Sequence, residues 1–483
     1  MNGPTTVKNL SARKSEILAD SNRNAADRQE FWQRAEFFHE EDSRYLRFLI
    51  PGGSRVLELG CGIGNTLASL KPSFGLGVDF STEMITQAQR LHPNLQFQVG
   101  DVEDPEFLAS LPGPFDVILI VDTIGSLDDC QAMLEALHCL CNRETRLVIV
   151  YYSHLWEPLI RVAEWIGWRA RQSEQNVFSP ADIHALASLS NFEVIKAESR
   201  LLSPLRLFGI GRFINRFISI LPAIRHLSLR HYSVCRSLLQ RYDDIRSASV
   251  IIPARNERGN IEAAIKRMPR FCDDLEIVFV EGHSNDGTLT EIKRVVEAYP
   301  DQDIKLMTQP GKGKADAVFA GFDAARGDVL MILDADLTVP PEQLPKFWRC
   351  ISDGKGEFIN GSRLVYPMER GAMKFLNLIA NKAFSLIFSW LLNQRVTDTL
   401  CGTKVLRRSD YKRLQAGRSY FGDFDPFGDF DLIFGATKLN LRCAEVPIRY
   451  SARTYGETQI SRFRHGFLLI RMVIFAFFRI KAF

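Results

Sequence analysis

The chain has 483 residues, of which 46% are hydrophobic and 24% are charged, and its formal net charge is only +3. This composition excludes a largely disordered chain and predicts about three globular domains, or two larger ones. The nine cysteines lack the paired spacing of a zinc site, and residues 1–8 lack the apolar core of a secretion signal. We therefore expect a reduced, cytoplasmic setting.

Short apolar runs in the first half of the chain predict the strands of a sheet. They lie at residues 54–59, 75–79, 96–99, 115–121 and 146–151, with helix-like segments between them. Strands that alternate with helices indicate a doubly wound parallel sheet, in which ligands bind at the carboxyl ends of the strands. The same region shows no basic stripe interleaved with aromatic residues, so we expect no nucleic-acid partner.

A glycine-rich loop follows the first of these strands. Gly60, Gly62 and Gly64 allow a ligand to lie against the backbone where a helix begins. Asp79 ends the second predicted strand about twenty residues later, where a carboxylate can hold both hydroxyls of a ribose. A nicotinamide-binding loop would carry Gly or Ala near position 65, which is Asn65 in this chain.

Together with Glu58, the loop resembles the first motif of class I S-adenosylmethionine-dependent methyltransferases, and Asp101 resembles that family's adenine-side acid. The resemblance covers roughly residues 45–200 and implies a Rossmann-like domain over residues 1–200. It also implies that S-adenosylmethionine is bound by five residues, namely Glu58, Gly60, Gly62, Asp79 and Asp101. Residues 122–129 follow the fourth strand, and we expect this segment to face the methyl group. A glycine turn without a ligand, or a non-catalytic binding module, is the alternative.

Residues 201–246 predict a basic amphipathic linker between two domains. From Leu205 to Tyr242 the chain has seven arginines and no acid, and Phe213, Phe217 and Ile220 recur at helical spacing. Such a segment suits an anionic membrane surface. A helix that packs its apolar side on a catalytic core is the alternative.

Three strand-like runs in the second half lead into acidic loops at residues 249–257, 281–288 and 334–336. Because the carboxyl ends of parallel strands meet at one edge of a sheet, we expect these acids to converge. In the last loop, Asp334 and Asp336 flank one small residue. This pair suits Mg²⁺ or Mn²⁺ bridging a diphosphate, with the ion neutralising charge on a departing nucleotide. An isolated pair of this kind is usually only a solvated turn.

The second half as a whole resembles the family 2 glycosyltransferases of the GT-A fold, specifically the polyprenyl-phosphate (dolichol-phosphate) mannosyl- and glucosyltransferases. The matching segments are 252–257, 311–315, 325–328, 334–337, 360–363, 398–404, 445–447 and 453–458. The resemblance implies a domain over residues 247–483, so that the chain has two doubly wound α/β domains. It also implies inverting transfer of a sugar from a nucleotide-sugar to a polyprenyl phosphate.

The same resemblance assigns the residues of the sugar-transfer site. The nucleotide-sugar pocket is assigned to Pro253, Arg255, Glu257, Glu281, Lys312 and Asp334. Glu281 and Gly282 stand where the family usually has two aspartates, so the choice of nucleotide stays open. Asp334 and Asp336 are the expected metal ligands, and Asp336 is also assigned to catalysis.

The acceptor determines which further residues are needed. A lipid phosphate is already ionised near neutral pH, so its transferase needs cations to place it more than a base to activate it. Arg363, Arg370 and Arg453 are the candidates, because the planar guanidinium suits phosphate oxygens. A polysaccharide or glycolipid hydroxyl would need a base, for which Asp429 is the candidate. The alternative role of Asp429 is to cap the helix that begins near Leu432.

Two apolar stretches, residues 375–392 and 464–483, predict helices that lie in a membrane interface. The first is crossed by polar residues at every fourth position, namely Asn377, Asn381, Ser385 and Ser389. It is therefore too interrupted for a comfortable span of roughly twenty residues. The second carries arginines near one face, namely Arg464, Arg471 and Arg479. We expect peripheral attachment to the cytosolic face of a membrane. A buried domain helix or a single span is the alternative.

Overall fold

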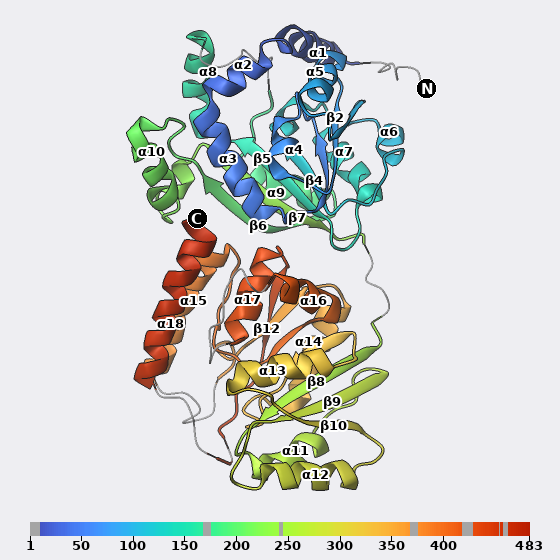
Figure 1. Ribbon diagram of the computed structural model, residues 1–483, viewed down its shortest axis with the longest axis vertical. Coiled ribbons are helices and arrows are strands. Elements are labelled where there is room, and N and C mark those ends of the chain that lie inside the picture. The colour runs from blue at the N-terminus through green and yellow to red at the C-terminus, as the bar shows by residue number, and fades with distance from the viewer. Residues whose placement is uncertain are drawn as a thin grey trace. The chain divides into compact units, whose positions relative to one another are not determined.

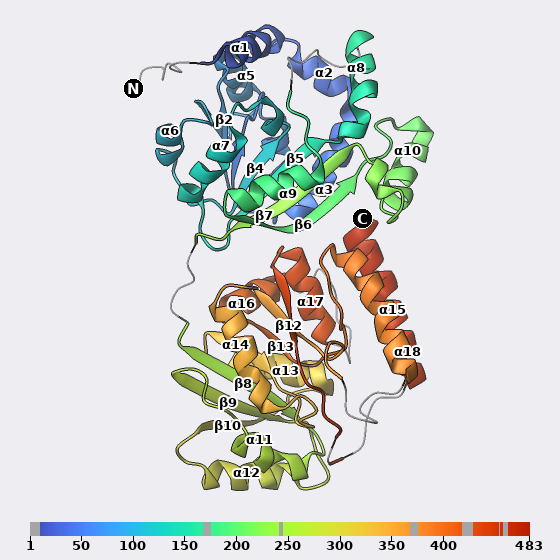
Figure 2. The ribbon, with the colours of Figure 1, turned by 180° about the vertical axis from the view of Figure 1, so that it is seen from behind.

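The computed structural model of the protein forms two compact units, one up to Arg241 and the other from Tyr242 onwards. Each unit has one seven-stranded sheet with helices packed on its faces (Figures 1 and 2). The expected fold class of two α/β domains is confirmed. The structure describes residues 10–167, 175–240, 245–367, 375–417, 428–453, 455–456 and 462–483.

The sheet of the first unit has the strand order β3-β2-β1-β4-β5-β7-β6. β1 to β5 are parallel, and β7 is antiparallel to both of its neighbours, β5 and β6. All five strands expected from the sequence are present. The strands are β1 (Arg55–Leu59), β2 (Phe74–Asp79), β3 (Gln96–Val99), β4 (Val117–Val121), β5 (Arg146–Tyr152), β6 (Phe192–Arg200) and β7 (Arg230–Ser237).

The structure differs from the predicted linker over residues 201–246. Residues 230–237 form β7 inside the first sheet, and the first unit therefore extends to Arg241 rather than to residue 200. Arg230 and Arg236 are buried, and Arg236 forms an ion pair with Glu193 at 2.7 Å. Arginines that suggested an exposed basic segment are thus partly internal, because acids from elsewhere in the unit neutralise them.

The helices of the first unit surround a core of Leu, Ile and Val side chains, of which Leu57, Ile118 and Ile149 are fully buried. Local capping fixes where some of them begin: the Ser81 hydroxyl accepts a hydrogen bond from the Met84 amide at the start of α5. The helices are α1 (Ala12–Asn24), α2 (Arg28–Arg34), α3 (Glu36–Leu49), α4 (Asn65–Leu70), α5 (Thr82–Leu91), α6 (Pro105–Ala109), α7 (Cys130–Ala136), α8 (Glu157–Trp165), α9 (Pro180–Leu189) and α10 (Ile210–Phe213).

The sheet of the second unit has the order β10-β9-β8-β11-β13-β12-β14. β8 to β11 are parallel, β13 is antiparallel to β11 and β12, and β14 is parallel to β12. The strands are β8 (Ser247–Ala254), β9 (Asp274–Glu281), β10 (Asp303–Thr308), β11 (Val329–Ile332), β12 (Phe358–Ser362), β13 (Lys404–Arg407) and β14 (Cys443–Pro447).

Eight helices of the second unit lie in the part of the chain that the structure describes, and both apolar stretches expected to be helical are among them. Figures 1 and 2 show α15 and α18 side by side along one edge of the unit. The helices are α11 (Ile261–Lys266), α12 (Thr288–Ala298), α13 (Gly313–Ala324), α14 (Leu344–Ser352), α15 (Phe375–Leu392), α16 (Arg408–Ala416), α17 (Gly428–Lys438) and α18 (Arg462–Ala476).

The side chains of α15 are distributed in the opposite way to those of an ordinary surface helix. The polar residue Asn381 is buried, whereas Leu386 is 74% exposed. On the inner side, Phe388 is fully buried and stacks on Phe434 of α17. Within the described residues, no helix combines the length and the apolar character that crossing a bilayer requires.

α18 adds to the same apolar surface. Phe467, Ile470 and Ile474 are exposed, and Trp390 of α15 contacts Phe477 just beyond α18, with ring centroids 5.9 Å apart. Neither helix contains an acid in its sequence. Both helices therefore expose large apolar side chains, although α15 turns the polar Asn381 toward the unit.

Candidate functional sites

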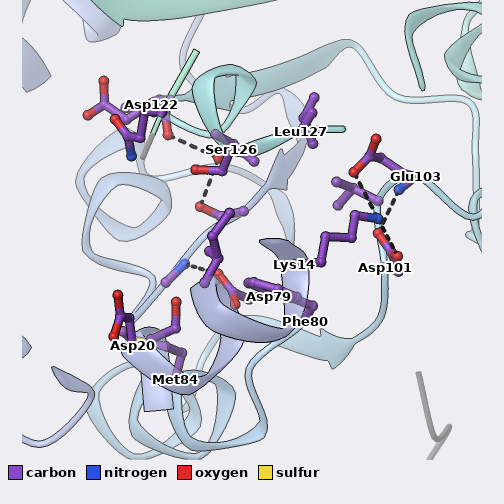
Figure 3. A pocket seen from close by; sticks show the side chains of 18 of the residues that line it. Lys14, Asp20, Asp79, Phe80, Met84, Asp101, Glu103, Asp122, Ser126 and Leu127 are labelled. Atoms are coloured by element: carbon purple, nitrogen blue, oxygen red, sulfur yellow. Dashed lines mark hydrogen bonds and ion pairs between the residues drawn. The ribbon is translucent and has the colours of Figure 1, made fainter. Parts of the chain in front are cut away.

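A cavity of about 180 Å³ lies at the carboxyl ends of β1, β2 and β4 in the first unit (Figure 3). The strand order reverses between β1 and β4, and this is where a doubly wound sheet leaves a crevice for ligands. Gly60 and Gly62 line the cavity, together with three acids near strand ends, Asp79, Asp101 and Asp122. Four of the five residues predicted to bind S-adenosylmethionine therefore meet at one cavity.

The two glycines of this loop have different steric surroundings. Gly60 has φ +74°, and a Cβ there would lie 2.0 Å from the Thr123 hydroxyl, so packing against the next loop requires glycine. Gly62 has φ +51°, and a Cβ there would meet no other atom within 4 Å. Because Gly62 opens onto the cavity, its missing side chain leaves room for a ligand against the backbone, which fits a nucleoside such as that of S-adenosylmethionine.

Asp79 ties the glycine loop to the end of β2. Its carboxylate accepts hydrogen bonds from the Gly62 and Ser81 amides, both at 2.9 Å. Burial raises the pKa of this carboxyl, although the two backbone donors favour the ionised form. Each carboxylate oxygen keeps a second lone pair for a ribose hydroxyl.

Glu58 is not among the residues that line the cavity, in contrast to its expected contact with the cofactor. It is almost completely buried and accepts a hydrogen bond from the Leu67 amide at 3.0 Å, near the start of α4. Burial raises its pKa to about 8. Glu58 therefore supports the strand and helix that hold the glycine loop.

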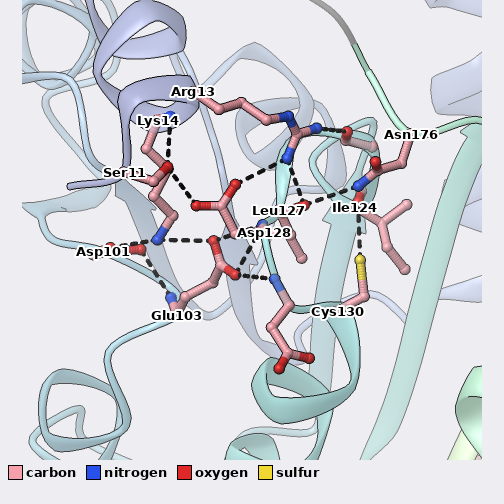
Figure 4. Close-up of polar contacts among 12 residues, drawn as sticks. Ser11, Arg13, Lys14, Asp101, Glu103, Ile124, Leu127, Asp128, Cys130 and Asn176 are labelled. Carbon is pink, nitrogen blue, oxygen red and sulfur yellow. Dashed lines mark hydrogen bonds and ion pairs between the residues drawn. The ribbon is translucent and has the colours of Figure 1, made fainter.

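Helix α1, which the sequence does not reveal, contributes several residues to the lining of the cavity, and Figure 4 shows the polar contacts made by its first turn. Lys14 forms ion pairs with Asp101 at 2.6 Å and Glu103 at 2.8 Å. Arg13 bonds to Asp128 at 3.0 Å and to the Leu127 carbonyl at 2.8 Å. Asp101, the expected adenine-side acid, is thus held by a lysine. The only signal in the sequence is a capping serine, Ser11, followed by two cations.

A network of ion pairs around the buried Arg230 reaches the cavity at Asp122. Arg230 of β7 is fully buried, lies 3.3 Å from Asp42 of α3 and also forms an ion pair with Asp122. Asp122 has φ +60° and lines the cavity. The expected methyl-facing segment, residues 122–129, therefore begins with a carboxylate that the arginine of β7 holds in place.

In the second unit, Arg453 joins two of the predicted acidic loops. Its guanidinium donates to Asp336 Oδ2 at 2.6 Å and to Glu257 Oε1 at 3.1 Å. Glu257 also accepts a hydrogen bond from the Asn260 side chain at 2.7 Å. Burial raises the pKa of Glu257, and Arg453 opposes that effect. Residues 196 positions apart in the sequence thus meet beyond the ends of β8 and β11.

Asp334 faces a second cation, the ammonium of Lys314, at 2.6 Å. Although burial opposes ionisation, Lys314, Lys404 and Arg363 hold the pKa of Asp334 below its usual range. A Cβ on Gly402 would lie 2.1 Å from Asp334 Oδ2, so the loop that contains it presses against this pair. Lys314 is a functional candidate that the sequence analysis missed. Lys312, which it chose, is exposed at the N-cap of α13.

The donors at Asp334 and Asp336 fit a divalent cation. Carboxylate oxygens are the ligands that Mg²⁺ and Mn²⁺ prefer, and both carboxylates already attract the positive charge of a lysine or an arginine. Within the described ranges, no three His, Cys, Asp or Glu side chains are arranged so that they could hold a metal ion by themselves. These two acids would therefore hold the ion together with oxygens from the nucleotide and water.

The remaining nucleotide-pocket candidates lie on the neighbouring strands β8 and β9. Ala254 and Glu281 are register partners in the parallel pair, which places Pro253 and Arg255 beside the end of β9. Glu281 is buried and accepts a hydrogen bond from the Ser284 amide at 2.6 Å. The expected convergence of acidic strand ends is therefore observed.

Arg363 has a partner that competes with its expected role at an acceptor phosphate. Its guanidinium forms two hydrogen bonds to Asp398, both at 2.7 Å, and Asn381 of α15 donates to the same carboxylate at 2.9 Å. Despite the cost of burial, Asp398 holds the pKa of Arg363 above its usual value. The pair, together with Asn381, links α15 to the residue that directly follows β12. Arg370 and the side chain of Asp429 lie outside the described residues.

Two family models match the chain, one for each half. A model described as a methyltransferase domain matches residues 26–197, and the model of glycosyl transferase family 2 matches residues 249–414. The chain joins a methyltransferase domain to a family 2 glycosyltransferase domain. Both resemblances drawn from the sequence are thereby confirmed.

The glycosyltransferase domain has curated relatives. It is 40% identical over 217 residues to a dolichol-phosphate mannosyltransferase of Pyrococcus furiosus, which covers 44% of this chain and 58% of that one. It is 31% identical over 115 residues to an undecaprenyl-phosphate 4-deoxy-4-formamido-L-arabinose transferase of Aeromonas hydrophila, covering 23% of this chain and 35% of that one. The chain thus spans less than two thirds of the length of these relatives.

Solved structures resemble both domains. The methyltransferase domain is similar to an S-adenosylmethionine-dependent methyltransferase from Thermotoga maritima, with 18% identity, a TM-score of 0.36, and coverage of 46% of this chain and 99% of that one. The glycosyltransferase domain is similar to glucosyl-3-phosphoglycerate synthase from Mycobacterium tuberculosis, with 18% identity, a TM-score of 0.37, and coverage of 49% and 80%.

Proposed function

We propose that the chain is a bifunctional enzyme of the membrane surface. Its glycosyltransferase domain transfers a sugar, with inversion, from a nucleotide-sugar to a polyprenyl phosphate. Its methyltransferase domain transfers a methyl group from S-adenosylmethionine. The observation that carries the first activity is the meeting of Glu257, Asp336 and Arg453 beside Asp334 and Lys314.

The charges of this site suit the departure of a nucleoside diphosphate. A divalent ion held by Asp334 and Asp336 would neutralise negative charge on that leaving group. Lys314 and Arg453 bring two further positive charges to the same place, on the first turn of α13 and beyond β14. Such preorganised charge lowers the barrier where negative charge develops.

A phosphate acceptor agrees with the side chains that surround the site. Arg453 supplies a planar donor fork, and a lipid phosphate needs placement more than deprotonation. Relatives named as dolichol-phosphate and undecaprenyl-phosphate transferases support the same acceptor class. Transfer to a polysaccharide or glycolipid hydroxyl, with Asp429 as base, is the competing proposal.

Attachment to the membrane is assigned to the exposed apolar surface of α15 and α18. Ser389 and Asn381 turn inward to bond Val396 and Asp398, which leaves Leu386 and Ile379 facing outward. Each basic side chain near a bilayer with anionic lipids adds about 1 kcal/mol of attraction. Lys382 and the arginines of α18 supply such charge.

The test of sugar transfer is an assay of the full chain with nucleotide-sugars and polyprenyl phosphate in membranes. Asp336→Asn or Asp334→Asn should lower transfer at least ~10²-fold, because preorganised charge is lost. Asp353→Asn, which changes an exposed carboxylate paired with Lys355, is the matched control. Transfer that survives both site substitutions and a chelator would refute the metal role.

The acceptor class and the membrane helices can be separated in the same assay. Leu386→Ser together with Ile474→Ser should reduce transfer to long-chain lipid phosphate and spare transfer to a short, water-soluble prenyl phosphate. Equal loss on both acceptors would show that these residues support the fold instead. Calorimetric titration with S-adenosylmethionine tests the other domain, since a non-catalytic module that no longer binds the cofactor should give no heat.

A further inference from the structure

The methyltransferase domain has an unusual apolar stripe on α8 and the turn before it. Leu155, Leu159, Val162 and Ile166 follow one another at spacings of four, three and four residues, and all are exposed. That spacing places them on one side of a helix. Trp165, at the end of α8, is 77% exposed. Solvent-facing helices ordinarily carry polar residues at such positions.

A second exposed apolar segment comes from residues 205–227. Phe208 is exposed over its whole surface, and Ile210 and Phe213 are also exposed. Leu207, Phe208 and Gly209 all have positive φ values, +45°, +53° and +98°. Positive φ is unfavourable for leucine and phenylalanine, and a folded chain keeps such strain mainly where it serves a function. Here the strained turn holds a large aromatic ring out from the protein.

These two segments form one surface, which we call the α8–α10 face and define as the exposed side chains of residues 155–166 and 205–227. The indole of Trp156 donates to the Leu227 carbonyl at 2.7 Å. Trp156 and Ile160 pack on the same small cluster as Leu201 and Leu229. Figures 1 and 2 agree in showing α8 and α10 along the same edge of this unit.

The charge of the α8–α10 face indicates which partner it fits. Residues 205–227 contain four arginines and no acid, and residues 155–166 contain one arginine and two glutamates, so these two segments together carry a net positive charge. Arg206 and Arg212 stand at the edge of the face, where both contact the single carboxylate of Glu40. Exposed tryptophan and phenylalanine with surrounding arginine are the side chains that settle at the boundary between lipid headgroups and acyl chains.

We propose that the α8–α10 face docks the methyltransferase domain on an anionic lipid bilayer. The docking is independent of the membrane helices assigned to the glycosyltransferase domain. It deepens the proposed methyl transfer, on which this second part rests, because it names the acceptor class as a molecule carried by the bilayer. In the sequence, Ile166 at the end of the apolar stripe lies nine positions before Gln175, which lines the cofactor cavity.

A spin label at the tip of the face tests the docking directly in the full chain. Phe208→Cys, in a Cys139→Ser background that removes an exposed thiol, carries the nitroxide, and Gln131→Cys on α7 is the control position. On vesicles of phosphatidylcholine and phosphatidylglycerol, label 208 should gain collisions with oxygen and lose collisions with an aqueous nickel complex. Label 131 should not change. If label 208 stays water-accessible on sedimented vesicles, the docking proposal is wrong.

Partition measurements test the energy of the same contact. Leu159→Ala combined with Phe208→Ala should lower partition onto anionic vesicles by about tenfold or more, since each side chain gives up lipid contact. Leu189→Ala, an exposed leucine of α9 outside the face, is the matched control and should leave partition unchanged. Equal partition of both variants would overturn the proposal, as would equal partition onto neutral and anionic vesicles.

The acceptor class needs its own readout. With S-adenosylmethionine labelled in the methyl group, label should enter the organic phase of a lipid extract with the unchanged chain and fall with the Leu159/Phe208 variant. Heat of S-adenosylmethionine binding should be the same for both. Label that enters only water-soluble products would refute the bilayer acceptor. Absence of S-adenosylmethionine binding in the unchanged chain would refute the proposed methyl transfer while leaving the spin-label result intact.

Discussion

Replacement of Glu58 by glutamine should change how the stability of the methyltransferase domain depends on pH. Burial raises the pKa of Glu58 from 4.5 to about 8, so the carboxyl is protonated in the folded domain and ionised in the unfolded chain at intermediate pH. The sign follows from linkage. When folding raises the pKa of a carboxyl, its contribution to stability is fully present below the pKa of the group in the unfolded chain. That contribution is lost as the pH rises through the pKa of the group in the folded domain.

The size of this effect follows from the two pKa values. Between pH 5.5 and 7.5 the folded state holds nearly one proton more than the unfolded state. Raising the pH over this range therefore lowers the free energy of unfolding by about 2–3 kcal/mol. Glu58→Gln keeps an oxygen for the Leu67 amide but cannot ionise. The free energy of unfolding of the variant should therefore not show this fall between pH 5.5 and 7.5. For a domain of this size, the difference corresponds to about 5–10 °C in Tm.

The assay is thermal unfolding of the full chain at both pH values, with and without S-adenosylmethionine to identify the transition of this domain. The quantity compared is the pH-induced change in Tm for the unchanged chain and for the variant. Glu83→Gln, at an exposed position of α5, is the matched control. An identical pH-induced change in the unchanged chain and in Glu58→Gln would show that Glu58 is ionised in the folded domain, and the reasoning would fail.

Three further predictions concern contacts described above. Asp79→Ala should weaken S-adenosylmethionine binding by ~1–3 kcal/mol in calorimetry, through a ribose diol left without its acceptor, and unchanged affinity would leave the motif a purely structural one. Arg363→Met should destabilise the glycosyltransferase domain by about 3–5 kcal/mol in denaturant unfolding, because Asp398 would stay buried without its guanidinium partner. A change confined to the Michaelis constant for the acceptor would instead indicate that Arg363 is a phosphate ligand. Lys14→Met should speed amide exchange in α1, since Asp101 and Glu103 lose their shared cation, and unchanged exchange would show that other contacts hold the helix.

The parts of the sites that follow directly after strands could be predicted from the sequence. Gly60, Gly62 and Asp79 lie where a local pattern places them, since a strand, a turn and a helix start are fixed within a few residues. The same holds for Asp334 and Asp336 after β11. In these cases the positions of the side chains follow from the parallel sheet itself, whose strand ends share one edge.

Other parts depend on residues far away in the sequence. The chemistry of arginine predicts a phosphate ligand at Arg363, but its guanidinium binds Asp398, 35 residues later. Lys314 rather than Lys312 reaches Asp334, because α13 begins at Gly313 and places Lys314 in its first turn. The sequence does not reveal β7, because its arginines indicate an exposed segment and the acids that pair with them come from distant parts of the unit.

The position of β7 determines where the chain can be divided. β7 pairs with β5 on one side and with β6 on the other, although it follows β6 in the sequence. A fragment that stops at residue 200 would keep β6 without β7, its neighbour in the described sheet, expose the edge of β5 and leave Asp42 and Asp122 without Arg230. Such a fragment would leave the edge of β5 and the whole of β6 unpaired, and unpaired strand edges favour aggregation. A fragment designed to contain the methyltransferase domain alone should therefore extend to residue 240.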